Sequence, residues 1–305
     1  MRRCALALLC ALAVTPAPAH DSPGDVIHAV SHRIEQEGPT ARLLAARAFE
    51  YQSLGQWNAA IADFDGALAL QPRFSAALQG LAEAHLHLGN WTDAEAAAQR
   101  AIALYDDDGR RAPGQALLAQ VLEAQTKWPE ALDAWREALK APYPDVDWFL
   151  GESRCLGQLG RYDDQAAALA LARSRNPSVV LHRAWVRALV DGGQLDAARA
   201  EIEAGLEKTR WQSSWLLLRA RIYAKQGDTS RQHEDALAAL VELQGRVNPE
   251  NPDRWLLTEC AVALALAGEE TQAREYETQA RTLGASGADL LEIDLLLGAE
   301  TATPP

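Results

Sequence analysis

Two runs of apolar residues at helical spacing stand on either side of a glycine in residues 41–72. The first run is Leu44, Ala48 and Tyr51, and the second run is Ala60, Phe64 and Ala67. Residues three or four positions apart lie on one face of a helix, so the pattern predicts two amphipathic helices. Gly55 separates them and supplies the backbone freedom that a turn between helices requires. Pro72 ends the unit, because proline does not continue a helix.

A short sequence motif marks the same turn further along the chain. It consists of glycine, any residue, an aromatic residue, two further residues and then alanine. It begins at Gly55 and at Gly89, and weaker copies begin at Thr126, Gly160, Gly193, Gly227 and Gly268. Most of these starts lie about 34 residues apart, which is the period of a repeat built from two helices. One pair of helices cannot bury its apolar face alone, so neighbouring pairs are expected to stack and share a core.

The spacing and the residue types resemble those of the tetratricopeptide-repeat family. The resemblance covers residues 41–285 and is strongest in the first two repeats, whereas later repeats carry Gln232 at a small-alanine position and Glu277 at an aromatic position. It implies an all-α fold, a right-handed α-solenoid of about seven helical hairpins with terminal capping helices. The implied repeats lie near residues 41–74, 75–108, 112–145, 146–178, 179–212, 213–246 and 254–285.

The segments outside the repeats are expected to cap the solenoid or to extend from it. We expect a leading helix and a linker in residues 20–40, a capping helix in residues 286–298 and a disordered tail in residues 299–305. Caps are expected because an end repeat otherwise exposes an apolar face. The extra residues between repeats, 106–110 and 245–252, are expected to form loops.

The first 19 residues have the three parts of a secretory signal peptide. Arg2 and Arg3 give a basic start, residues 4–14 are uncharged and apolar, and Ala17-Pro18-Ala19 fits a cleavage site. The apolar run is short for a stable membrane anchor, and an uncleaved N-terminal membrane helix is the alternative. Arginine far outnumbers lysine, a bias typical of GC-rich bacterial genomes. We therefore expect a periplasmic or secreted protein.

The charge and the motif content narrow the function. The formal net charge is −13, and loss of Arg2 and Arg3 with the signal peptide takes it to about −15. A chain this acidic repels the phosphates of nucleic acids, and no segment after the signal peptide is apolar enough to insert into a membrane. Motifs for a nucleophilic serine, a zinc-protease helix and a phosphate-binding loop are absent. We expect no enzyme activity, no catalytic residues and no cofactor.

The family resemblance implies a concave groove, lined by the first helix of each repeat, that binds a peptide or a partner protein. In repeats four to seven the groove positions combine apolar residues with a basic set and one tryptophan: Arg154, Arg183, Arg187, Arg221, Lys225 and Trp255. Arg183 and Arg187 are four residues apart and project together. Arginine forks bind carboxylates, so an acidic partner segment is expected. The alternative is that these arginines pair with Asp147, Glu152 and Asp191 on adjacent helices.

This basic set is similar to the carboxylate clamp of some peptide-binding members of the family. That clamp also uses asparagine, which is absent from the matching positions here, so the resemblance favours an acidic segment over a C-terminal carboxylate. Among the tryptophans, Trp211, Trp215 and Trp255 are expected to be the freest for partner contact. Cys155 and Cys260 are expected to be buried apolar residues, with an intermolecular disulfide as the alternative.

A metal-handling accessory protein is the alternative function. Cleavage after Ala19 leaves His20 at the N-terminus, and His28 and His32 lie four residues apart on the predicted leading helix. An N-terminal amine with three imidazoles offers a binding set for Cu or Zn. The simpler interpretation is a frayed terminus with two surface histidines.

Overall fold

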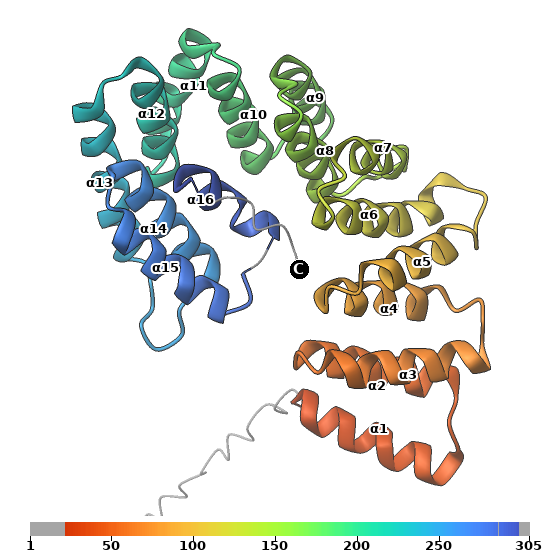
Figure 1. Ribbon diagram of the computed structural model, residues 1–305. Coiled ribbons are helices and arrows are strands. Elements are labelled where there is room, and N and C mark those ends of the chain that lie inside the picture. The colour runs from red at the N-terminus through yellow and green to blue at the C-terminus, as the bar shows by residue number, and fades with distance from the viewer. Residues whose placement is uncertain (1–21, 286, 299–305) are drawn as a thin grey trace, which may run out of the picture. The chain divides into compact units, whose positions relative to one another are not determined.

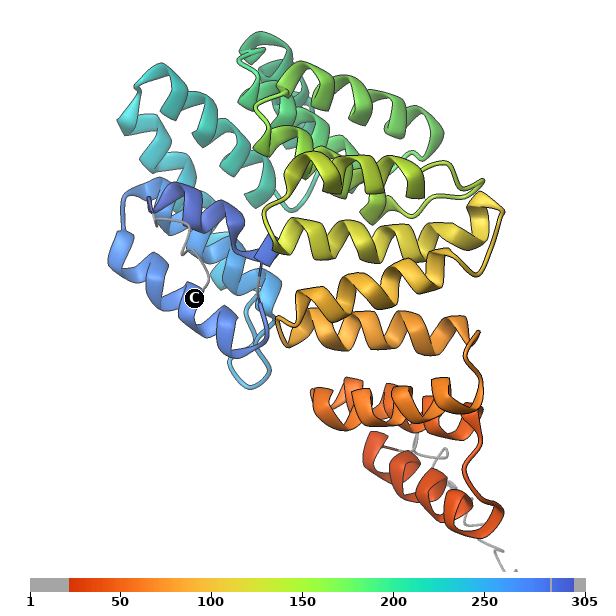
Figure 2. The ribbon, with the colours of Figure 1, turned by 45° about the vertical axis from the view of Figure 1, so that its right-hand side comes forward.

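The computed structural model describes residues 22–285 and 287–298, and within these ranges every regular element is helical. The expectation of an all-α repeat fold is therefore confirmed. The chain divides into two compact units, Met1–Ala101 and Ile102–Pro305. In each unit successive helices pack as antiparallel neighbours, and each hairpin contacts the next (Figures 1 and 2). None of the helices in the described ranges combines the length and the apolar character needed to span a membrane.

The first unit holds a leading helix and two hairpins. Its helices are α1 (Pro23–Glu37), α2 (Ala41–Ser53), α3 (Trp57–Leu70), α4 (Ser75–His87) and α5 (Trp91–Ile102). Ser22 caps α1, since its hydroxyl accepts a hydrogen bond from the amide of Asp25 while the Asp25 carboxylate accepts one from the amide of Ser22. Thr40 caps α2 in the same way through the amide of Leu43.

The second unit holds five hairpins and a short C-terminal helix. The helices, in chain order, are α6 (Asp108–Ala124), α7 (Trp128–Ala138), α8 (Val146–Gln158), α9 (Tyr162–Arg175), α10 (Val179–Asp191), α11 (Leu195–Lys208), α12 (Ser213–Gln226), α13 (Thr229–Gln244), α14 (Arg254–Ala267), α15 (Glu270–Thr282) and α16 (Leu291–Leu296). A 3-10 turn, Gly287–Asp289, precedes α16. Figure 1 shows the hairpins of this unit following one another in chain order.

The turns inside the hairpins explain the recurring glycine. Gly55 and Gly89 have φ of +68° and +72°, in the left-handed region where a side chain is costly. Thr126 takes the same place in the third hairpin with φ of +58°. The turn geometry is thus kept where the sequence has lost the glycine, and the threonine carries the strain that a Cβ introduces there.

Glycines within the helices allow neighbouring hairpins to approach closely. A Cβ on Gly80 would lie 2.3 Å from the Phe64 ring, and one on Gly151 would lie 2.3 Å from the Trp135 ring. In both pairs the ring belongs to the second helix of one hairpin and the glycine to the first helix of the next. Phe64 and Trp135 are buried as a result, and each ring fills the space between two hairpins.

The pair formed by Gly205 and Trp215 exchanges these roles. The glycine lies on the second helix, α11, and the ring lies on the following first helix, α12, with a would-be Cβ 2.4 Å from the ring. Trp215 is only 4% exposed, so its predicted freedom for partner contact is wrong. Its large ring occupies the gap that the missing side chain leaves.

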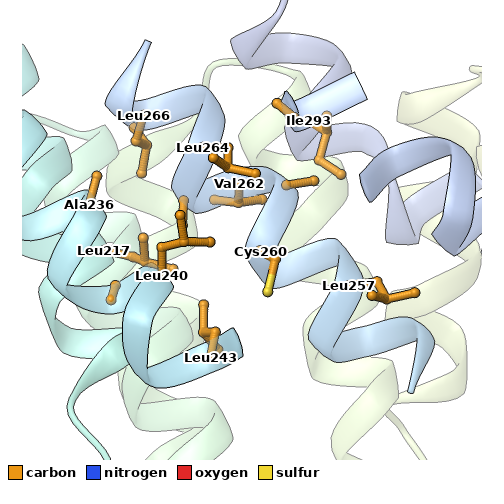
Figure 3. Packing of buried hydrophobic residues seen from close by; sticks show 14 of the residues in the cluster. Leu217, Ala236, Leu240, Leu243, Leu257, Cys260, Val262, Leu264, Leu266 and Ile293 are labelled. Atoms are coloured by element: carbon orange, nitrogen blue, oxygen red, sulfur yellow. The ribbon is translucent and has the colours of Figure 1, made fainter. Parts of the chain in front are cut away.

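The C-terminal part of the second unit has its own apolar core. Leu217, Leu240, Leu243, Leu257 and Leu264 come together from α12, α13 and α14, and Ile293 of α16 joins them (Figure 3). Cys260 is buried in this core, Cys155 is buried near α6 and α7, and both thiols are free. Burial raises the pKa of Cys260 to about 11, as expected for a thiol without polar contact to solvent.

Two predicted segments differ in detail from the structure. Residues 106–110 are not wholly a loop, because α6 begins at Asp108 and the Asp107 carboxylate caps it through the amide of Arg110. The closing segment contains only six residues of α-helix, Leu291–Leu296, after the 3-10 turn. Residues 1–21, 286 and 299–305, which include the predicted signal peptide and tail, lie outside the described residues.

Candidate functional site

The first helices of the last four hairpins place the predicted groove residues on neighbouring elements. Arg154 lies on α8, Arg183 and Arg187 lie on α10, Arg221 and Lys225 lie on α12, and Trp255 lies on α14. Helix α10 contacts both α8 and α12, and α12 contacts α14. We call the surface formed by α8, α10, α12 and α14 the A-helix face. The predicted basic residues come from three adjacent helices of one compact unit.

Arg154 is engaged by an acid of the preceding hairpin. Its guanidinium lies 3.1 Å from the carboxylate of Glu123 on α6. That carboxylate also accepts hydrogen bonds from the indole nitrogen of Trp135, at 2.6 Å, and from the Cys155 thiol, at 3.5 Å. Arg154 therefore follows the alternative interpretation, in which the groove arginines pair with acids on adjacent helices, although its partner is Glu123. The predicted partner Glu152 instead binds Arg136 at 3.0 Å.

Arg183 and Lys225 contact neutral oxygens on neighbouring first helices. Arg183 donates a hydrogen bond to the hydroxyl of Ser214 on α12. Lys225 donates one, at 3.2 Å, to the backbone carbonyl of Asp191 on α10. Both contacts cross between α10 and α12, so these side chains lie along the line where the two helices meet. Among the residues that the structure describes, neither positive charge therefore has a bound carboxylate.

Arg187 and Arg221 converge on one carboxylate. Arg187 of α10 and Arg221 of α12 both contact Glu292, which lies on α16. The side chain of Arg221 is 13% exposed and that of Glu292 is 21% exposed. Two guanidiniums from different helices thus share one anion in a partly dry environment, where charge-assisted contacts are stronger than in water.

The buried guanidinium of Arg221 requires a negative charge beside it. Burial and the neighbouring Arg187 guanidinium lower the pKa of Arg221, while the carboxylates of Asp191 and Glu259 oppose that shift. Arg187 also lies 3.6 Å from Asp191, one turn away on its own helix. A positive charge this poorly solvated needs negative partners, and Glu292 is the carboxylate that contacts it directly, beside the charges of Asp191 and Glu259.

Glu292 was not among the residues that the sequence singled out. It belongs to the run Leu290, Leu291, Glu292, Ile293, Asp294, Leu295 and Leu296. A carboxylate between apolar residues that face a core is unusual, because burying an unpaired charge is costly. This pattern indicates that a basic side chain pairs with Glu292, but the sequence does not show which one.

Trp255 and Trp211 are exposed tryptophans of the second unit. Trp255 is 55% exposed and lies beside the guanidinium of Arg254, 5.2 Å from its ring centre. Trp211 lies outside the A-helix face, between Arg210 and Arg246, whose guanidiniums are 5.0 and 5.4 Å from the ring centre. Both of these predicted contact residues are therefore open to solvent, and Trp255 is the one on the A-helix face.

The structure brings together only part of the predicted metal set. His28 and His32 are exposed on α1, and a ring nitrogen of His32 lies 3.4 Å from the side-chain amide of Gln36. His20 lies outside the described residues. Across residues 22–285 and 287–298, no three His, Cys, Asp or Glu side chains are grouped to hold a metal ion.

The repeats correspond to a known family. A tetratricopeptide-repeat model matches residues 43–109, 117–179 and 183–232, which together are more than half of the chain. The chain belongs to the tetratricopeptide-repeat family. No curated protein matches the chain significantly. Comparison with known proteins therefore identifies the repeat family and its fold.

Solved structures of this repeat family have the same fold. A tetratricopeptide repeat protein from Parabacteroides merdae has a TM-score of 0.54 at 16% identity, covering 79% of this chain and 93% of that one. PilW, a type IV pilus biogenesis factor, has a TM-score of 0.53 at 19% identity, with coverages of 67% and 97%. PilF of Pseudomonas aeruginosa has a TM-score of 0.50 at 17% identity, with coverages of 74% and 98%. Likeness at these identities concerns the fold alone.

Proposed function

We propose that this protein is a periplasmic scaffold that binds an acidic segment of a partner protein on the A-helix face of its second unit. The observation that carries the proposal is the convergence of Arg187 and Arg221 on the single carboxylate of Glu292. Two guanidiniums from adjacent helices form a receptor for one acidic side chain. Proteins of this repeat family act as protein-interaction scaffolds, which fits a role in binding.

The charge contrast supports an acidic partner. The chain has a net charge of −13, yet the A-helix face gathers Arg183, Arg187, Arg221 and Lys225 on two neighbouring helices. Within the described part of the chain, Arg183 and Lys225 contact neutral oxygens and no carboxylate, so their charges add to the attraction of an acidic segment. Such a local field raises the rate of encounter with an oppositely charged partner. Trp255, on the next first helix, supplies an exposed apolar surface beside it.

The periplasmic location rests on the N-terminal signal. Residues 1–19 combine a basic start, an apolar stretch and an Ala-x-Ala site. Fractionation of cells that produce the tagged chain, with N-terminal sequencing of the product, tests this part. Recovery of a periplasmic protein that begins at His20 supports it, and an uncleaved protein in the cytoplasm contradicts it.

Crosslinking in the cell tests the binding role. Proteins crosslinked to the wild-type chain are identified by mass spectrometry and compared with those captured by an Arg183→Glu, Arg187→Glu double variant. The double variant is expected to lose the acidic partner, because it reverses two charges of the A-helix face. Arg175→Glu with Arg199→Glu is the matched control, since these arginines are exposed on the second helices α9 and α11. Identical captured sets from both double variants and the wild type would overturn the proposal.

A further inference from the structure

The C-terminal segment occupies part of the face that the proposed partner needs. Glu292 of α16 contacts Arg187 and Arg221, the same side chains that make the face a carboxylate receptor. Helix α16 lies beside α14 in both views of the ribbon (Figures 1 and 2). The segment Gly287–Gly298 therefore occupies the two guanidiniums that would bind the partner's carboxylate, including the deeply buried one of Arg221.

The resident segment is short and is anchored mainly by apolar side chains. Leu290 and Ile293 are buried against the α14 core, Leu296 and Leu297 pack against it while partly exposed, and Leu295 is exposed. Besides the Glu292 contacts, its polar contacts include a 3.4 Å pair between Arg281 and Asp294 and a 3.4 Å hydrogen bond from Arg274 to the carbonyl of Leu297. Both of these contacts are long.

A hairpin helix of the same unit is held far more firmly. Helix α14 contributes Leu257, Cys260, Val262, Leu264 and other side chains to the core, and packs on α12, α13 and α15. Helix α16 is six residues long and contributes a single buried residue. Opening of a weakly packed end helix costs less free energy than opening of a central one, so α16 is expected to be released more easily than α14.

We propose that α16 is a built-in competitor for the carboxylate receptor, and that the partner is an acidic–apolar segment that displaces it. This inference rests on the proposed function. Such a partner presents a carboxylate to Arg187 and Arg221 and, in the adjoining position, an apolar side chain to the site of Ile293. Attraction between Glu292 and the arginines then sets a threshold, because a partner must bind the face more strongly than the resident segment does.

A labelled peptide that copies residues 287–298 serves as the probe, since it carries the chemistry that the receptor already accepts. Its affinity is measured for the full chain and for the Glu292→Gln and Ile293→Ser variants, each of which loosens the resident segment. Both variants are expected to bind the probe about tenfold more tightly than the wild type, equal to about 1.4 kcal/mol. Adding Arg221→Gln to Glu292→Gln is expected to remove that gain. Glu137→Gln is the control, an exposed carboxylate on α7 that pairs with Lys140.

Hydrogen exchange distinguishes a competitor from a purely structural cap, because a cap that stays in place would show no change in amide exchange when the probe binds. Saturating probe is expected to increase amide exchange of residues 287–298 in the full chain, because the resident helix leaves its site. The proposal that α16 competes for the receptor would be wrong if the probe bound without faster exchange of residues 287–298. It would also be wrong if the wild type and both loosened variants bound the probe with equal affinity. If partner proteins are still lost by the Arg183→Glu, Arg187→Glu variant in cells, the proposed function stands even then. Thermal unfolding of each variant shows that it remains folded.

Discussion

Arg187 donates a hydrogen bond to Glu292, a residue 105 positions later in the chain. In a repeat array each hairpin normally contacts only its immediate neighbours, so this contact joins parts of the second unit that stacking alone would not connect. Arg221, on the intervening first helix, contacts the same carboxylate. The end of the chain is thereby tied to α10 and α12 as well as to α14.

The ion pair of Arg221 and Glu292 is expected to stabilise the second unit. Glu292→Gln leaves two guanidiniums without their shared anion, and this variant is expected to lose about 1–3 kcal/mol of unfolding free energy. Arg221→Gln in the same chain is expected to restore part of that loss, because it removes one of the stranded charges. A double-mutant cycle by urea unfolding measures the coupling. The exposed pair of Arg274 and Glu270 is the control, with a coupling under about 0.5 kcal/mol; equal couplings for both pairs would contradict the prediction.

Gly80→Ala is expected to destabilise the first unit. The new Cβ would lie 2.3 Å from the Phe64 ring, which is fully buried between α3 and α4. Overpacking of this kind costs about 1–3 kcal/mol, and Phe64→Leu in the same chain should recover part of it by making room. Gly24→Ala is the matched control, because its Cβ meets only the Ser22 hydroxyl at 3.7 Å and alanine is the better helix former. Chemical denaturation compares the variants, and a Gly80→Ala protein as stable as the wild type would rule out the close approach.

Asp235→Ala is expected to be costly because it breaks a two-point contact. Both carboxylate oxygens of Asp235 accept from Arg219, at 2.7 and 2.9 Å, and the carboxylate is only 9% exposed. The same bidentate contact joins Arg47 to Asp63 in the first unit. The hydrogen bonds that Arg219 donates to Asp235 raise the pKa of Arg219, so removal of Asp235 leaves a charged, partly buried guanidinium with only the exposed carboxylate of Glu203 beside it among the described residues. We expect a loss of about 2–3 kcal/mol in unfolding free energy.

Glu137→Ala provides the comparison for Asp235→Ala. Glu137 pairs with Lys140 at 2.6 Å, but both side chains are about half exposed. Solvent screens such a pair, and its removal should cost under about 0.5 kcal/mol. Urea midpoints of the two variants, measured under the same conditions, test the difference. Similar midpoints would mean that the Arg219 contact contributes no more than a surface pair.

The hairpins were predictable from sequence because their determinants are local. Gly55 marks a turn that needs positive φ, and the apolar spacing around it defines two helices. The period, with Trp128 and Ala131 after it, predicts Thr126 as a turn residue, and Thr126 adopts the same left-handed conformation. Local rules therefore gave the fold class and the positions of the basic residues along the first helices.

The partners of those residues depended on contacts between distant helices. Trp215 was expected to be accessible because its position in the repeat does not show that Gly205 of the preceding helix leaves a space for its ring. Glu292 was not selected at all, since its cations lie on α10 and α12. Periodicity fixes which face a residue occupies, whereas such pairings follow from packing between hairpins.

His182 is expected to make the stability of the second unit depend on pH. Its ring contacts Glu201 at 3.2 Å and lies edge-on to Trp215, 5.6 Å between ring centres. Burial, followed by the charges of Arg173 and Lys208, lowers the pKa of His182, and Glu201 opposes this shift.

A lowered pKa in the folded state means that the unfolded chain takes up the proton first as the pH falls. The stabilisation contributed by neutral His182 is therefore complete above about pH 6.5, its ordinary pKa, and is lost as the pH falls below that value. The unfolding free energy of the wild type is expected to fall more steeply between pH 7.5 and pH 5 than that of His182→Gln. Urea unfolding at several pH values measures the two slopes, with His28→Gln, which replaces an exposed imidazole on α1, as the control. A wild-type slope equal to that of His182→Gln would show that the imidazole gains no stability from remaining neutral.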